Sequence, residues 1–114
     1  MNWDLYLARE WEKRKYYLLH AREYVKKIKD ICVKEIDPEC RVILFGSVAR
    51  GNFRIDSDVD VLVITKVRDE IDRARVSQKL HDAIGVREPF EIHIVTKEEY
   101  ENWYKRFIDV YEEY

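Results

Sequence analysis

The chain has 114 residues, of which 46% are hydrophobic and 39% are charged, and its formal net charge is −2. This length favours one domain that buries roughly two-thirds of the surface of its unfolded chain, and the hydrophobic content excludes a disordered protein. The near-neutral charge leaves no electrostatic footprint for long nucleic acids. No apolar run approaches the ~20 residues of a membrane span, and residues 1–10 carry charge where a signal peptide would not.

Two cysteines, Cys32 and Cys40, stand outside any C-x-x-C pair and lack the spacing of metal ligands. We therefore expect both to be reduced thiols with packing roles in a cytoplasmic protein.

The first predicted element is a helical segment over residues 1–36. From Tyr17 onward, apolar side chains recur at three- and four-residue steps, as on one face of a helix. They are Ala21, Val25, Ile28, Cys32 and Ile36. Pro38 ends the segment, because proline disfavours helix in the residue before it.

The start of this segment is rich in aromatic side chains, more than a short surface helix needs. They are Trp3, Tyr6, Trp11, Tyr16 and Tyr17. Two interpretations stay open: packing against the sheet, or a protein–protein interface, where Trp and Tyr are enriched.

Three apolar runs predict strands, at residues 41–46, 59–65 and 90–95. The second run is almost continuously apolar, which is typical of a strand buried on both faces. The resulting order, α-β-β-α-β-α, predicts an α/β (α+β) domain in which a small mixed central sheet is flanked by helices.

Two helices complete the predicted order. The first runs from a cap at Asp69 to about residue 84 and ends at Gly85. Its expected inner residues are Ile71, Ala74, Leu80, Ala83 and Ile84. The second helix opens with a capping box, Thr96 to Glu99, and its side chains Trp103, Phe107 and Tyr111 are expected in the core.

The stretch GSVARGNFRIDSDVD, residues 46–60, contains most of the candidate functional residues. Side chains alternate along a strand, so Asp58 and Asp60 should share one face with their Cα atoms about 6.5 Å apart. Two such carboxylates repel each other unless solvent or cations neutralise them. Mg²⁺ prefers carboxylate oxygens and keeps waters or phosphates as further ligands, so this pair is a candidate metal site.

The beginning of the stretch suits a phosphate. Gly46 lets the backbone approach a ligand closely, Ser47 adds a hydroxyl donor, and a short helix over residues 47–50 would offer free N–H groups. Arg50 follows one turn later. Together with Asp58 and Asp60 this predicts a nucleoside triphosphate site; the alternative is a capped turn before an acidic strand.

Residues 46–63 resemble the signature of the minimal nucleotidyltransferases, members of the DNA polymerase beta-like superfamily. The matching positions, which end in an apolar strand at residues 61–63, are Gly46, Ser47, Arg50, Gly51, Ser57, Asp58 and Asp60. The resemblance implies a single nucleotidyltransferase domain over residues 1–114, with residues 1–36 as an N-terminal helical segment and residues 41–114 as the catalytic core.

The resemblance also implies a third carboxylate on a later strand, and the candidate is Glu91. It shares a strand face with His93, which could orient Glu91 or contact substrate; many family members carry aspartate at this position. The alternative for Glu91 is an exposed edge-strand residue. Asp56, the competing carboxylate, lies in the loop before the strand and is expected to be a turn residue.

The site that the family implies has two parts. Asp58, Asp60 and Glu91 are the catalytic residues and the ligands of two Mg²⁺ ions. Gly46, Ser47 and Arg50 bind the phosphates of the nucleotide.

The family implies transfer of a nucleotide, AMP from ATP, onto an acceptor hydroxyl, with a protein as acceptor. Such chains commonly pair with a small helical HEPN-domain protein as antitoxin and toxin, and a partner chain or a homo-oligomer should complete the site. The alternative is a non-catalytic binding module that neutralises its partner by forming a complex.

Overall fold

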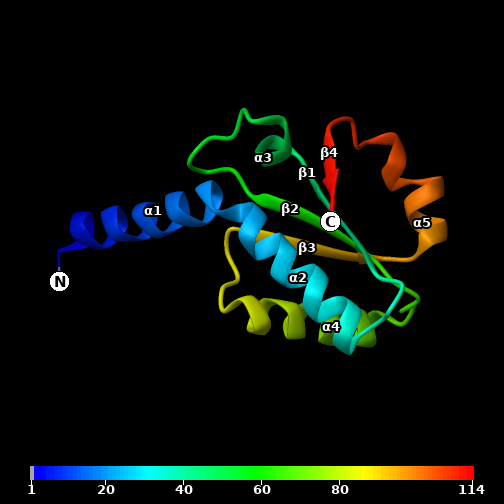
Figure 1. Ribbon diagram of the computed structural model, residues 1–114. Coiled ribbons are helices and arrows are strands. Elements are labelled where there is room, and N and C mark those ends of the chain that lie inside the picture. The colour runs from blue at the N-terminus through cyan, green and yellow to red at the C-terminus, as the bar shows by residue number, and fades with distance from the viewer. Residues whose placement is uncertain (1) are drawn as a thin grey trace.

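A four-stranded sheet with the order β3-β2-β1-β4 organises the chain in a computed structural model, which describes residues 2–114 (Figure 1). The strands are β1 Arg41–Phe45, β2 Val59–Ile64, β3 Phe90–Val95 and β4 Tyr111–Glu113. β1 runs antiparallel to β2 and to β4, whereas β2 and β3 are parallel. The predicted mixed central sheet flanked by helices is therefore confirmed.

Within residues 2–114, five α-helices and one 3₁₀ helix connect and cover these strands. The helices are α1 Trp3–Leu19, α2 Ala21–Glu35, α3 Ser47–Arg50, α4 Glu70–Ile84 and α5 Lys97–Asn102, with the 3₁₀ turn at Tyr104–Arg106. The predicted caps are present, since the Asp69 side chain accepts the N–H groups of Ile71 and Asp72. Thr96 and Glu99 also form the predicted capping box.

The sheet separates two apolar clusters of unequal size. The larger cluster packs α2 and α4 against one face, where Val42, Leu44, Val61 and Val63 are fully buried. The smaller one lies on the other face under α5, around Leu62 and the buried residues next to it. The central strand β2 is thus buried on both faces, as its apolar sequence predicts.

The N-terminal segment is two helices and not one. α1 and α2 meet at His20, whose backbone leaves the helical region (φ −107°, ψ 16°) and whose Nδ1 lies 2.8 Å from the Tyr16 carbonyl oxygen. The predicted inner side chains of α2 are buried: Ala21, Val25, Ile28 and Cys32. α1 projects beyond the sheet (Figure 1).

Part of the predicted inner face of α4 is wrong. Leu80 and Ile84 are buried, but Ile71 is 64% exposed and Ala74 is also exposed. At the start of α4 the side chain that points inward is Arg73. Its guanidinium donates hydrogen bonds to the carbonyl oxygens of Val67 and Ile94 and to the Glu99 carboxylate. Charged hydrogen bonds therefore replace apolar packing at this end of the helix.

The prediction of one long C-terminal helix with a buried aromatic stripe is also wrong. Trp103, Phe107 and Tyr111 are 59%, 66% and 50% exposed, because α5 ends at Asn102 and the chain then turns back as β4. β4 pairs with the edge of β1. Its two glutamates, Glu112 and Glu113, are held by arginines on opposite faces of the sheet, Arg22 and Arg41.

Cys32 and Cys40 are joined by a disulfide, so the expectation of reduced thiols is wrong for this structure. The turn at Asp37 folds the chain back on the end of α2, since the Asp37 carboxylate accepts the Glu39 N–H and the Asp37 carbonyl accepts the Cys40 N–H. This brings the two Cα atoms to 6.1 Å, within the range of disulfides.

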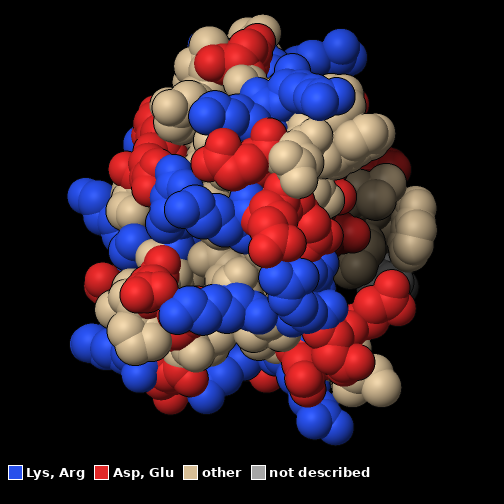
Figure 2. Space-filling model, turned by 90° about the vertical axis from the view of Figure 1, so that its right-hand side faces the viewer, with Lys and Arg blue, Asp and Glu red and all other residues tan. Residues whose placement is uncertain are grey.

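Positive and negative side chains interleave over the side of the molecule that lies at the right in Figure 1, as Figure 2 shows. The surface there presents no broad field of one sign. Among residues 2–114, no helix combines the length and the apolar character that crossing a bilayer requires.

The Arg73–Glu99 pair gives a testable pH dependence. Hydrogen bonds from Arg73, and then the Thr96 N–H, lower the pKa of Glu99 to about 2 from its ordinary 4.5. The pair therefore stabilises the fold fully above pH 4.5 and progressively less as the pH falls toward 2. We expect Glu99→Gln to cost about 1–2 kcal/mol near neutral pH, less than the whole shift implies because Glu99 is partly exposed.

Thermal unfolding followed by circular dichroism at pH 7 and at pH 3 measures this effect. The melting temperature of Glu99→Gln should fall below that of the wild type at pH 7, and the gap should narrow at pH 3. Glu98→Gln is the matched control, because Glu98 forms only an exposed ion pair with Arg68. A gap that stays constant with pH would contradict the assigned charge interaction.

Candidate functional site

Asp60, Glu91 and His93 form a cluster at one end of the sheet. Asp60 lies on β2 and is the direct pairing partner of Glu91 on β3. Because side chains alternate along a strand, His93 shares the face of Glu91. One ligand atom from each of these residues lies within 4.8 Å of the other two, and His93 Nε2 is 3.6 Å from Glu91 Oε1.

The Asp60 carboxylate is electrostatically unfavourable in this place. Burial is the first cause and the negative charge of Glu91 the second, and together they raise the pKa of Asp60 to about 6 from its ordinary 3.8. The charges of His93 and Arg50 oppose the shift. A cation bound between these carboxylates would remove the repulsion, because an opposite charge favours the ionised form.

Gly46 brings the predicted phosphate turn against the predicted carboxylate. Its backbone has φ +80°, and a Cβ added there would overlap the Asp60 carboxylate. Only glycine combines this conformation with such close approach. Two predicted parts of the site, which are fourteen positions apart in sequence, are therefore in contact.

The short helix α3 follows Gly46 as predicted and carries Ser47 at its start and Arg50 at its end. The Arg50 guanidinium lies 3.6 Å from the Asp109 carboxylate, in the segment between the 3₁₀ turn and β4. Arg50 also lies near enough to lower the pKa of Asp60. The C-terminal segment thus borders the same end of the sheet.

Asp58 is not one of the three residues whose ligand atoms lie within 4.8 Å of one another. β2 begins only at Val59, so Asp58 belongs to the preceding loop. Its Oδ1 accepts a hydrogen bond of 3.0 Å from Arg14 of α1. Asp58 remains close enough that its charge contributes to the raised pKa of Asp60.

Arg14 is a site residue that sequence reasoning missed. Besides Asp58, its guanidinium donates to the carbonyl oxygens of Ile55, Asp56 and Ser57 at 2.8, 3.2 and 2.8 Å. The side chain is only 17% exposed. No spacing or motif relates position 14 to a loop more than forty residues away; only the fold reveals the contact.

The donor set fits a divalent cation. Asp60 and Glu91 offer carboxylate oxygens, which are the ligands that Mg²⁺ prefers. Asp58 could add a further oxygen, because only its Oδ1 accepts a hydrogen bond from Arg14. His93, which the sequence left between orienting Glu91 and contacting substrate, lies within reach of Glu91. Asp56, the competing carboxylate, lies in an exposed turn as expected.

An acidic cluster at one end of a mixed sheet, with a glycine turn pressed against it, is an arrangement in which an α/β protein can hold a divalent cation beside a phosphate. Residues 25–112 match the family model described as a nucleotidyltransferase domain. The chain therefore belongs to the nucleotidyltransferase-domain family, which confirms the resemblance. The match begins within α2 and leaves α1 outside it.

Relatives agree with this family. A putative protein adenylyltransferase of Methanocaldococcus jannaschii is 49% identical over 45 residues, which cover 40% of this chain and 42% of that protein. The matched part thus spans less than half of the length of this curated relative. A crystal structure of a putative nucleotidyltransferase has 32% identity and a TM-score of 0.55, covering 78% of this chain and 95% of the other.

A second solved structure, a putative nucleotidyltransferase from Sulfolobus solfataricus, has a TM-score of 0.54 and 22% identity over 89% of this chain and 81% of the other. At this identity the likeness shows a shared fold alone.

Replacing Asp60 should stabilise the metal-free protein. Above pH 6 the ionised carboxylate opposes folding, whereas below pH 3.8 it is protonated in both the folded and the unfolded chain and costs nothing. Asp60→Asn should therefore melt a few degrees above the wild type at pH 8 in a chelator, with no difference below about pH 3.8.

Adding Mg²⁺ at pH 8 should raise the melting temperature of the wild type more than that of Asp60→Asn, because a ligand that binds only the folded state stabilises it. Asp56→Asn, in the exposed turn, is the matched control. A metal-free Asp60→Asn protein that melts below the wild type at pH 8 would contradict the raised pKa.

Replacing Arg14 should loosen the loop that carries Asp58. Lysine keeps the positive charge, but a single ammonium group cannot span acceptors on four residues as a planar guanidinium does. Arg14→Lys should cost about 1–2 kcal/mol and speed amide exchange in residues 55–58. Hydrogen–deuterium exchange by mass spectrometry measures this, with Arg9→Lys, an exposed position of the same helix, as control; unchanged exchange would refute the role.

Proposed function

We propose that this chain transfers a nucleotide, AMP from ATP, onto an acceptor hydroxyl of a protein in an Mg²⁺-dependent reaction. The observation that carries the proposal is the contact of Gly46 with the Asp60 carboxylate, beside Glu91. The chain belongs to the nucleotidyltransferase-domain family. The contact between the glycine turn and the carboxylate therefore supports the proposal that phosphate and metal bind at one shared site.

The proposed metal ligands are Asp58, Asp60 and Glu91, with two Mg²⁺ ions. When bound, these ions would neutralise charge on the transferring phosphoryl group and lower the pKa of the acceptor hydroxyl. Asp58 has one oxygen free of Arg14 for this purpose. His93, 3.6 Å from the Glu91 carboxylate, would hold Glu91 in orientation.

The proposed phosphate-binding residues are Gly46, Ser47 and Arg50. Gly46 lets the backbone come close, the Ser47 hydroxyl donates, and Arg50 brings a positive charge near Asp60. In the reaction the acceptor oxygen bonds to the α-phosphorus of ATP and pyrophosphate leaves. The chain's part is to position these groups and to offset their charge.

A protein acceptor is supported by the name of the M. jannaschii relative, a putative protein adenylyltransferase. By family analogy, the proposed acceptor is a small helical HEPN-type toxin, which the chain silences as its antitoxin. Cytoplasmic action stays a prediction. The alternative, a binding module that neutralises its partner by occlusion, is favoured by the exposed aromatic side chains of α1.

The decisive experiment incubates the purified chain with labelled ATP, Mg²⁺ and the protein encoded by its genomic neighbour. We expect label on the partner with the wild type and with the turn variant Asp56→Ala, and a loss of at least about a hundredfold with Asp58→Ala/Asp60→Ala, because the loss of metal ligands removes a charge-stabilising group. Label transfer that survives in the double variant would refute the assigned site.

The same variants separate catalysis from occlusion. If the chain acts as an enzyme, the double variant still binds the partner but no longer protects cells from it. If occlusion suffices, the double variant binds and protects as the wild type does, and nucleotide transfer is not the protective function.

A further inference from the structure

α1 makes the molecule longer than a chain of this size needs to be. The principal extents are 47 × 28 × 22 Å, and the radius of gyration is 14.8 Å. A compact domain of this length has a radius of gyration of about 13 Å. Figure 1 shows why: α1 extends away from the sheet, with only its last turns against the body.

The projecting helix leaves an excess of accessible surface. The chain exposes 7427 Å², roughly 700–800 Å² more than a monomer of 13.9 kDa is expected to expose. A standard protein–protein interface buries about 800 Å² on each partner. The excess is comparable to the area that each partner buries in a standard interface.

The exposed surface of α1 carries many large apolar side chains. Seven of the thirteen large hydrophobic side chains that are exposed among residues 2–114 belong to this helix. Trp3, Leu7 and Trp11 follow one another at four-residue steps and so form one stripe. Leu5 lies almost opposite Leu7, because successive residues are turned by about 100°.

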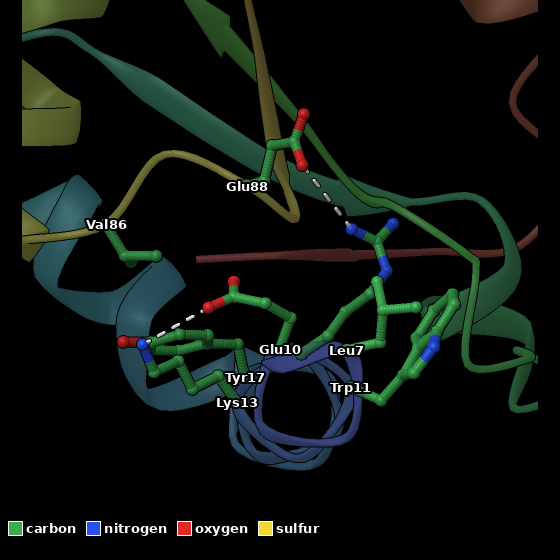
Figure 3. Close-up of a pocket in the computed structure, with 8 residues that line it drawn as sticks. Leu7, Glu10, Trp11, Lys13, Tyr17, Val86 and Glu88 are labelled. Atoms are coloured by element: carbon green, nitrogen blue, oxygen red, sulfur yellow. Dashed lines mark hydrogen bonds and ion pairs between the residues drawn. The ribbon is translucent and has the colours of Figure 1, made fainter. Parts of the chain in front are cut away.

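The stripe leads into a groove of about 390 Å³ between α1 and residues 86–88 (Figure 3). Leu7 and Trp11 form its outer part, Tyr17 and Val86 its inner part, and Glu88 faces Arg14 across it at 3.9 Å. The groove has room for one bulky aromatic side chain. α1 itself cannot supply this side chain, because Trp3 lies about 16 Å along the same helix from Arg14.

We propose that two copies of this chain pair through antiparallel α1 helices about a two-fold axis, so that each places Trp3 in the groove of the other. A two-fold interface requires one surface that complements itself, and α1 carries both the aromatic donor and the groove. The pairing goes beyond nucleotide transfer and does not depend on it.

The charges of α1 favour a second copy in this orientation. Its first part holds Asp4, Glu10 and Glu12 against a single arginine, and residues 13–15 are Lys-Arg-Lys. In an antiparallel pair with Trp3 beside Arg14 of the other copy, Asp4 lies opposite Lys13, and the two helix dipoles run in opposite directions. A parallel pair would place like charges together.

Sedimentation or light scattering of the purified chain at about 100 µM, where a complex of micromolar Kd forms, tests the proposal. We expect about twice the mass of 13.9 kDa for the wild type. Leu7→Glu should raise the dissociation constant at least about tenfold, as at the centre of an interface. Leu5→Glu, the same change on the opposite face, should leave it unaltered.

A cross-link identifies the contact. One tagged chain carries Asn2→Cys, next to an intact Trp3, and a differently tagged chain carries Glu88→Cys; a short bifunctional reagent should join the two in mixtures of folded protein, and dilution should abolish the product. The proposal is overturned if the wild type is monomeric, if Leu5→Glu disrupts pairing as strongly as Leu7→Glu, or if the cross-link fails to form. A monomer that binds only a different protein through α1 also overturns it.

Discussion

The parallel pairing of β2 with β3 is the constraint on which the candidate site depends. The register sets Asp60 beside Glu91 and places His93 on the same face. The rest of that face, farther along the strands, is apolar and packs under α5. One end of a single sheet surface therefore carries the acidic cluster while the other end is core, and a shift by one residue would turn the carboxylates toward the core under α2 and α4.

The ionised Asp60 carboxylate destabilises the fold at this position, and packing elsewhere in the sheet has to offset that destabilisation. Asp60 loses solvent and gains a like-charged neighbour, with burial as the larger cause of its raised pKa. The strand stays in place because Val61, Leu62 and Val63 are fully buried on both sides of the sheet. Strong apolar packing thus keeps the Asp60 carboxylate in a position where it is partly shielded from solvent. Carboxylates with a raised pKa are common at sites that bind charged ligands.

Much of this could be predicted from the sequence, because local patterns determine it. The three main strands, the caps at Asp69 and Thr96 and the glycine turn all follow from short-range chemistry. Glu91 could be paired with Asp60 only through the family resemblance. β4, the Cys32–Cys40 disulfide and the place of Arg14 could not be predicted, since each depends on contacts that only the complete fold creates.

Arg14 connects the two parts of the molecule that the family match separates. The match covers residues 25–112, so α1 lies outside the matched residues. Arg14 nevertheless holds the backbone of residues 55–57 and the carboxylate of Asp58, and it also forms a wall of the groove beside α1. If the proposed second copy fills that groove, it shields these hydrogen bonds from water and strengthens them. Pairing of α1 would then order the loop of Asp58, so that assembly and the proposed metal site share one side chain.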